Sequence, residues 1–284
     1  MHLTQPLAEL YIPDGLAASD ALARTTHLAI GAHQDDLEIM AYHGIQECFQ
    51  KPDHWFTGVV VTNGSGAPTR SGPYAGITDE RMVEIRRLEQ KRAAYLGDYA
   101  AQFLLEFPSS AVKSAVNQAP VEDLIQILEA TRPQVVYTHN LADKHDTHVG
   151  VTMKVIAALR ALPKAARPQQ VFGCEVWRDL DWMIDTDKVA HNVSERENLQ
   201  LALLGVFDSQ VAGGKRYDLA TLGRRRAHAT YHESHGVDAA TGITFAMDLT
   251  PLIQDDTLSP TAHVQAHIQR FHEDVTQRIA RCSG

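Results

Sequence analysis

Apolar segments alternate with amphipathic segments over the first 160 residues, and this alternation constrains the fold more than any other feature. The apolar segments have the composition of buried strands, and the others have apolar residues at helical spacing. The expected elements are strand 27–32, helix 37–49, strand 55–62, helix 78–97, helix 121–132, strand 134–138 and helix 151–159. Because no tight hairpin turn joins these strands, helices should connect parallel strands. We therefore predict an α/β fold, a Rossmann-like three-layer sandwich with a mostly parallel sheet.

The second half of the chain has a weaker pattern. Residues 170–176 resemble a strand and residues 195–207 a helix, but short apolar runs and polar turns fill the remainder. No internal repeat or low-complexity linker separates the two halves. We predict a single domain over residues 1–284, with a core at about 25–165 and a C-terminal extension at about 166–284.

Charge and hydropathy exclude several classes of partner. With 26 Lys and Arg against 35 Asp and Glu, the net charge of −9 disfavours binding to nucleic acid. No apolar run of about 18 residues and no signal-peptide pattern is present, which predicts a soluble cytoplasmic protein with no membrane partner. The 3 cysteines are scattered singly, without a CxxC motif, and indicate neither a disulfide framework nor a cysteine metal site.

Histidine and aspartate gather directly after two of the predicted strands. The chain has 15 histidines; the sequence HQDD follows the first strand at 33–36, and HNLADKHDTH follows another at 139–148. Ligands of open α/β sheets bind at the carboxyl ends of strands. Catalytic zinc takes three N or O protein ligands, which His33, Asp36 and His148 can supply. Asp35 would then be free to accept a proton from water.

Helix capping is the simpler alternative for each cluster. Asp35 or Asp36 can cap a helix that begins near residue 37, and Asp146 or Thr147 can cap one that begins near residue 149. Each short spacing also occurs by chance. The placement of both clusters after different strands favours a shared site.

These clusters resemble the motifs of the PIG-L or LmbE-like metal-dependent N-deacetylases. The family motif AHPDD stands here as AHQDD at 32–36, with Gln34 in place of proline. The family motif DxHxDH resembles DKHDTH at 143–148, in which the second acid is shifted but the histidines keep their three-residue separation. Weaker similarities are RRLE at 86–89, FDSQ at 207–210, with phenylalanine in place of histidine, and YHESH at 231–235.

The resemblance implies a hydrolase that removes an acetyl group from an N-acetylated amino sugar, such as N-acetylglucosamine, or from a conjugate of one. His33, Asp36 and His148 would bind Zn2+, although Fe, Co, Ni or Mn also suits such ligands. Asp35 would be the general base. The small-molecule substrate would be the main partner, and the resemblance is compatible with a homo-oligomer.

Further roles follow from the same resemblance. His145 would orient a ligand or hold the tetrahedral intermediate, and Arg86 would face the substrate. His235 would donate to the oxyanion, with His228 and His232 as rivals. Asp143 either hydrogen-bonds a metal-binding histidine or is an ordinary turn residue.

Several alternatives stay open at this point. Residues 215–216 and 224–226 are basic and form either a solvated face or a contact to an anionic substrate or subunit, and Trp177 and Trp182 are either a sugar platform or buried structural residues. The loop at 65–76 is long enough for a lid. The chain could also bind a metal and a ligand without turnover, or hydrolyse a different acyl amide. A nicotinamide oxidoreductase is disfavoured because GAHQDD at 31–36 is not GxGxxG.

Overall fold

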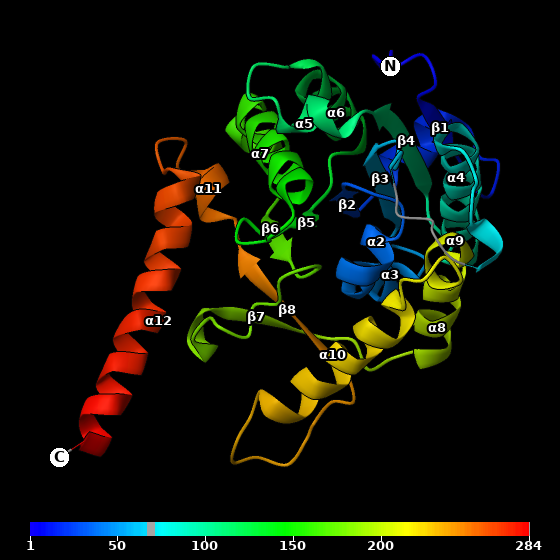
Figure 1. Ribbon diagram of the computed structural model, residues 1–284. Coiled ribbons are helices and arrows are strands. Elements are labelled where there is room, and N and C mark those ends of the chain that lie inside the picture. Colours follow the sequence, from blue (N-terminus) through cyan, green and yellow to red (C-terminus); the bar gives the residue numbers. More distant parts are fainter. Residues whose placement is uncertain (67–71, 284) are drawn as a thin grey trace.

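A single eight-stranded sheet organises the computed structural model, which describes residues 1–66 and 72–283 (Figure 1). The strand order is β1-β4-β3-β2-β5-β6-β8-β7. The strands are β1 Glu9–Tyr11, β2 His27–Gly31, β3 Phe56–Thr62, β4 Ala101–Phe107, β5 Val135–His139, β6 Gln170–Cys174, β7 Lys188–Asn192 and β8 Ile243–Asp248. The five central strands, β4 to β6, pair in parallel, whereas β1, β7 and β8 pair antiparallel. The predicted α/β class with a mostly parallel sheet is confirmed.

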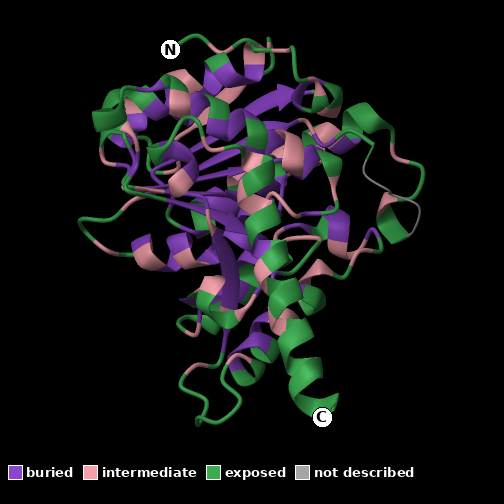
Figure 2. Ribbon diagram, turned by 90° about the vertical axis from the view of Figure 1, so that its left-hand side faces the viewer, coloured by how far each residue is buried: buried purple, intermediate pink, exposed green. Residues whose placement is uncertain are grey.

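Helices cover both faces of this sheet. The first-half helices are α1 Ala18–Ala23, α2 Asp36–Met40, α3 Tyr42–Cys48, α4 Asp79–Leu96, α5 Ser109–Lys113, α6 Ala119–Thr131 and α7 Asp146–Ala161. Leu28 and Ile30 of β2 pack in one apolar core with α6 and α7, while Ala29 packs with α2, α3 and α4 in a second core. Successive strand residues point to opposite faces, so one short apolar strand serves both cores. Figure 2 shows the buried strands between the helical layers.

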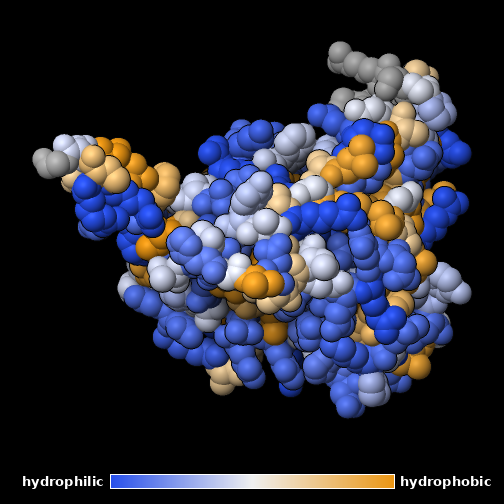
Figure 3. Space-filling view, turned by 90° about the horizontal axis from the view of Figure 1, so that it is seen from below, coloured by the Kyte–Doolittle hydropathy of each residue, from blue (hydrophilic) through white to orange (hydrophobic). Residues whose placement is uncertain are grey.

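The second half adds an antiparallel extension and further helices. These are α8 Glu197–Gly205, α9 Asp208–Val211, α10 Tyr217–Tyr231, α11 Pro251–Gln254 and α12 Pro260–Ser283. Helix α12 extends away from the body (Figure 1), and hydrophobic side chains lie along it (Figure 3). Across the described residues, no helix combines the length and the apolar character needed to cross a bilayer.

Two local features differ from the expectations, and a third expectation is untested. The helix expected at 37–49 is interrupted at Ala41, whose ψ of 22° leaves the helical region. Strand β4 was not expected, although all seven of its residues, AQFLLEF, are buried. The polar Gln102 and Glu106 within it obscure the apolar pattern. The predicted lid at 65–76 includes residues 67–71, which lie outside the described residues.

A cluster of buried histidines packs away from the site, where His191 of β7 stacks on His43 at 4.1 Å between ring centroids. Burial lowers the pKa of His191 to about 3, so the folded protein holds it neutral. The unfolded chain instead binds a proton below about pH 6.5, so stability falls as the pH drops through that value. We expect wild type to lose about 2 kcal/mol more unfolding free energy than His191→Phe between pH 7 and pH 5. Urea unfolding of both proteins at the two pH values measures this difference; equal losses would contradict it.

Candidate active site

The strand order reverses between the neighbouring strands β2 and β5, so the connections that follow these two strands run toward opposite edges of the sheet. β3 and β4 follow β2 on one side, and β6 follows β5 on the other. Such a switch point leaves a crevice at the carboxyl ends of the two strands. The segments at 32–36 and 140–148 leave the sheet here, so the topology brings the two predicted clusters together.

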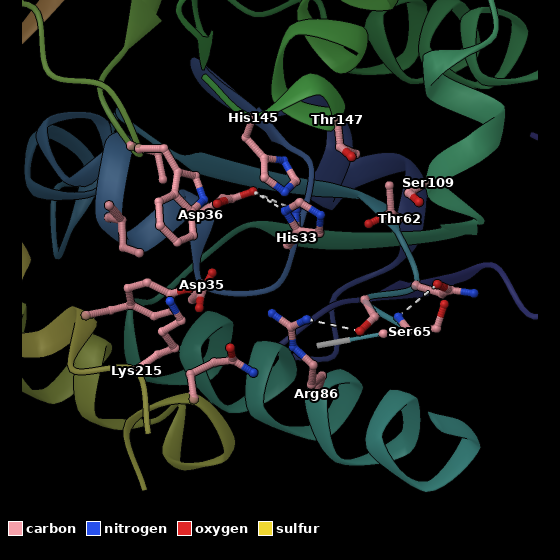
Figure 4. Close-up of a pocket in the computed structure, with 18 of the residues that line it drawn as sticks. His33, Asp35, Asp36, Thr62, Ser65, Arg86, Ser109, His145, Thr147 and Lys215 are labelled. Carbon is pink, nitrogen blue, oxygen red and sulfur yellow. Dashed lines mark hydrogen bonds and ion pairs between the residues drawn. The ribbon is translucent and has the colours of Figure 1, made fainter. Parts of the chain in front are cut away.

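His33, Asp36 and His148 converge on one point in this crevice. Figure 4 shows His33 and Asp36 there. The distance from His33 Nδ1 to His148 Nε2 is 3.2 Å, and Asp36 Oδ2 lies 3.3 Å from the former and 3.5 Å from the latter. Ligands about 2.0–2.1 Å from a tetrahedral metal lie roughly 3.3–3.4 Å from one another. The donor atoms therefore fit a single divalent ion.

His139 and His145 extend the cluster and allow other ligand combinations. The sets His33–His145–His148 and Asp36–His139–His148 also have donor atoms within 4.8 Å of one another. His139 Nε2, however, accepts a hydrogen bond from Ala32 N at 2.9 Å, so its lone pair is already used. The sequence did not lead us to expect His139 beside Asp36, where its Nε2 atom lies 3.4 Å from Asp36 Oδ2. The position of His139 as the last residue of β5 could have indicated this.

Asp143 fixes the orientation of the His148 ring. Its Oδ2 atom lies 3.3 Å from His148 Nδ1, which leaves Nε2 directed at the crevice. The same carboxylate accepts from His145 N at 3.1 Å and from Trp177 N at 3.2 Å. The expected contact between Asp143 and a histidine of the site is therefore present, and such contacts hold metal-binding imidazoles in place.

Asp36 is buried among imidazoles, and this environment sets its charge. Burial by itself raises the pKa of a carboxyl group, but the neighbouring His148 and His139 and a hydrogen bond from His33 hold the pKa of Asp36 well below its usual range. Its Oδ2 atom also accepts from His33 N at 2.6 Å. Asp36 is thus an ionised oxygen donor held in position.

Asp35 occupies the N-cap position of α2 but does not cap the helix. Its φ of 93° lies in the left-handed region, and its side chain makes no capping hydrogen bond. Oδ2 is buried without a hydrogen-bond partner, while the backbone N–H of Asp35 donates to Gln90 Oε1. Such strain in a non-glycine residue persists only where neighbours impose it, and here it turns the carboxylate toward the pocket. The capping alternative for Asp35 is wrong.

The charge of Asp35 depends on what lies beside it. Burial raises its pKa well above the usual range; Arg86 opposes this shift and Asp36 adds to it. A dication bound beside Asp36 would lower the pKa of Asp35 again, because a nearby positive charge favours the ionised carboxylate.

A pocket of about 400 Å³ surrounds these groups. Its lining includes His33, Asp35, Asp36, Thr62, Ser65, Arg86, Ser109, His145, Thr147, Trp177, Lys215 and Tyr217. Arg86 lines the pocket but is itself buried, donating to Gln34 O and Gly64 O. Gly64 has a φ of +68°, and a Cβ there would lie 2.6 Å from Arg86 Nη1, so this contact needs glycine.

The late histidines of the sequence lie elsewhere. His235 is exposed in the segment after α10 and is not among the residues that line this pocket, so its oxyanion role stays a prediction without support from the geometry. His228 Nε2 pairs with buried Glu175 at 3.2 Å, and His232 packs on Phe245. His145 does line the pocket, and its Nδ1 is buried without a hydrogen-bond partner.

The basic segments are not a uniform solvated face. Arg225 is buried and donates to the carbonyls of Glu38 and Ile39, so it supports helix α2 beneath the site. Arg224 donates to Val176 O, and Lys215 lines the pocket. The two basic segments thus contain residues that support the structure and a residue that lines the pocket.

Comparison with known proteins agrees with this architecture. Residues 28–159 match the model of the PIG-L family, described as GlcNAc-PI de-N-acetylase. Residues 28–159 are a PIG-L domain. His33, Asp35, Asp36, Arg86 and His148 all lie within the PIG-L domain, whereas Lys215 and Trp177 lie outside it.

Individual relatives and solved structures are similar to this chain at low identity. The uncharacterized deacetylase YaiS of Escherichia coli (strain K12) is 27% identical over 186 residues, which cover 64% of this chain and 89% of that protein. The N,N'-diacetylchitobiose deacetylase from Pyrococcus horikoshii has a TM-score of 0.56 at 16% identity, over 78% of this chain and 84% of that chain. GalB, the 4-carboxy-2-hydroxymuconate hydratase from Pseudomonas putida KT2440, has a TM-score of 0.57 at 14% identity, over 79% and 95%. Residues 28–159 are thus similar to deacetylases of the PIG-L/LmbE type.

Proposed function

We propose that this protein is a zinc-dependent hydrolase that removes the acetyl group from an N-acetylated amino sugar or a conjugate of one. The observation that carries the proposal is the convergence of three donor atoms, 3.2 to 3.5 Å apart, in a pocket that also holds the unpaired carboxylate of Asp35. His33, Asp36 and His148 would hold the ion. A bound zinc ion would lower the pKa of water toward neutrality and polarise the acyl oxygen.

Asp35 is suited to act as a general base, because it lines the pocket and its Oδ2 atom has no hydrogen-bond partner. Its unpaired Oδ2 would take a proton from the attacking water and later return it to the amine nitrogen as the C–N bond breaks. The left-handed backbone at Asp35 directs this carboxylate into the pocket. A protein that only binds a metal and a ligand has no use for such a buried, unpaired acid.

His145 would assist the same reaction from the opposite loop. Its ring centroid lies 5.2 Å from that of His33. A nitrogen in this position would donate to the oxygen of the tetrahedral intermediate. The comparisons support the substrate class, because the family description and the name of the Pyrococcus horikoshii enzyme both refer to N-acetylated sugars.

The test measures metal content and acetate release together. We expect about one zinc ion per chain and acetate release from N-acetylglucosamine or its conjugates, both lost after chelation and restored by zinc. Metal without turnover on a broad set of acetamides would instead favour a binding protein. Absence of metal would refute the site.

A further inference from the structure

Three lysines in or beside the pocket have Nζ atoms without a hydrogen bond or ion pair. Lys144 and Lys215 flank the pocket wall formed by Trp177, whereas Lys113 ends helix α5, which begins at Ser109. Across residues 1–66 and 72–283, no ion pair or hydrogen bond joins the Nζ atoms of Lys113, Lys144 or Lys215 to another residue. Each of the other five lysines has such a contact at Nζ; these are Lys51, Lys91, Lys154, Lys164 and Lys188. The unpaired lysines are therefore grouped at the site and are not spread over the surface.

Trp177 is the centre of this wall. Lys215 Nζ lies 5.1 Å and Lys144 Nζ 5.6 Å from its ring centroid, and Tyr217 packs edge-on against the same indole at 6.0 Å. The backbone N–H of Trp177 donates to Asp143, the residue that orients His148, and Arg224 donates to the adjacent Val176 carbonyl. The wall is thus fixed relative to the catalytic groups. Cations over an indole face keep their charge available to a ligand.

The charge balance of the pocket favours an anion. Its lining contains three cations, Arg86, Lys113 and Lys215, and two carboxylates, Asp35 and Asp36. Arg86 is occupied by backbone carbonyls, and Asp36 by histidines. Lys215 faces the pocket near Asp35 (Figure 4), and the structure has no ion pair within 4.0 Å between them. The opposite wall has neutral hydrogen-bonding groups, among them Thr62, Ser65 and Ser109.

We propose that Lys215, with Lys144 and the face of Trp177, forms a subsite for an anionic group, a carboxylate or a phosphate, carried by the substrate. The substrate is then an acidic acylamino sugar or conjugate whose acetamide lies at His33 and Asp35 and whose anion lies against the Trp177 wall. This inference rests on the proposed function for the acetamide, but the binding of the anion can be measured without turnover. A net charge of −9 makes this local positive field more selective, since the remaining surface repels anions.

The test compares the binding of three sugars to the zinc-loaded protein carrying Asp35→Asn. These are N-acetylglucosamine, its 6-phosphate, and N-acetylmuramic acid, which carries a carboxylate. We expect Lys215→Met in this background to weaken binding of the phosphate or the carboxylate sugar about five- to tenfold, and to change binding of the neutral sugar less than twofold. Added salt should weaken binding of the anionic sugar alone.

Two matched variants separate charge from structure. Lys215→Arg keeps the charge and should retain most of the anion affinity, whereas Lys164→Met removes a lysine remote from the pocket and should change nothing. Unchanged melting temperatures show that the chain is folded, and Lys215→Gln replaces the methionine variant if it is not.

The outcomes distinguish this inference from the proposed function. A selective loss for the phosphate or for the carboxylate sugar supports the subsite and identifies the anion. Equal affinities for neutral and anionic sugars, failure of both anionic sugars to bind, or equal losses for all three overturn it. If Lys215→Met selectively weakens the anionic sugar while wild type releases no acetate from any of them, the subsite stands and the proposed function fails.

Discussion

Replacing Asp35 with asparagine should lower kcat for acetamide hydrolysis about 10²- to 10⁴-fold, the range that a general base contributes. Asparagine has the same shape and tolerates the left-handed backbone that Asp35 adopts, so the turn and helix α2 should persist. It cannot accept the proton from water. Because Asp35 is not among the three converging donors, zinc content should stay near that of wild type.

Steady-state acetate release and elemental analysis of the same preparations measure this effect. Asp179→Asn is a matched control, since Asp179 is exposed and does not line the pocket. If Asp35→Asn keeps more than about a tenth of the wild-type kcat, Asp35 is not the base.

The central fold and the proximity of the two motifs could be predicted from the sequence for one physical reason. Parallel strands buried on both faces are continuous apolar runs, and their carboxyl ends meet at one edge of the sheet. Two polar motifs that follow such runs must therefore approach each other. This reasoning placed His33, Asp36 and His148 in one cluster, and the structure brings their donor atoms within 3.5 Å.

The same reasoning fails where contacts connect distant segments without local periodicity. The Trp177 wall depends on Asp143, 34 residues earlier, and the support of helix α2 depends on Arg225, about 187 residues later. Consecutive arginines look the same in the sequence whether their side chains are solvated or buried. Likewise, His235 matched a late family segment, but the segment lies in an exposed turn away from the pocket.

The ligand set can be decided by variants that remove one donor each. Asp36→Ala and His33→Ala should both lose stoichiometric zinc and, with it, acetate release. His139→Gln should keep the metal, because His139 Nε2 already accepts from Ala32 N. Elemental analysis after dialysis measures the metal, and the rise in melting temperature on adding zinc gives a second reading, since a ligand at 100 times its Kd stabilises a fold by about 2.7 kcal/mol.

A different pattern of zinc loss among these variants would identify a different ligand set. If His139→Gln and Asp36→Ala lose zinc while His33→Ala retains it, the ion binds the deeper set Asp36–His139–His148, in which all three residues are buried. His33, of which 21% of the side chain is exposed, would then face the substrate as a proton donor. The acetamide would bind nearer the pocket mouth, and Asp35 would need a bridging water to reach it. Retention of zinc by all three single variants would instead place the ion outside this crevice.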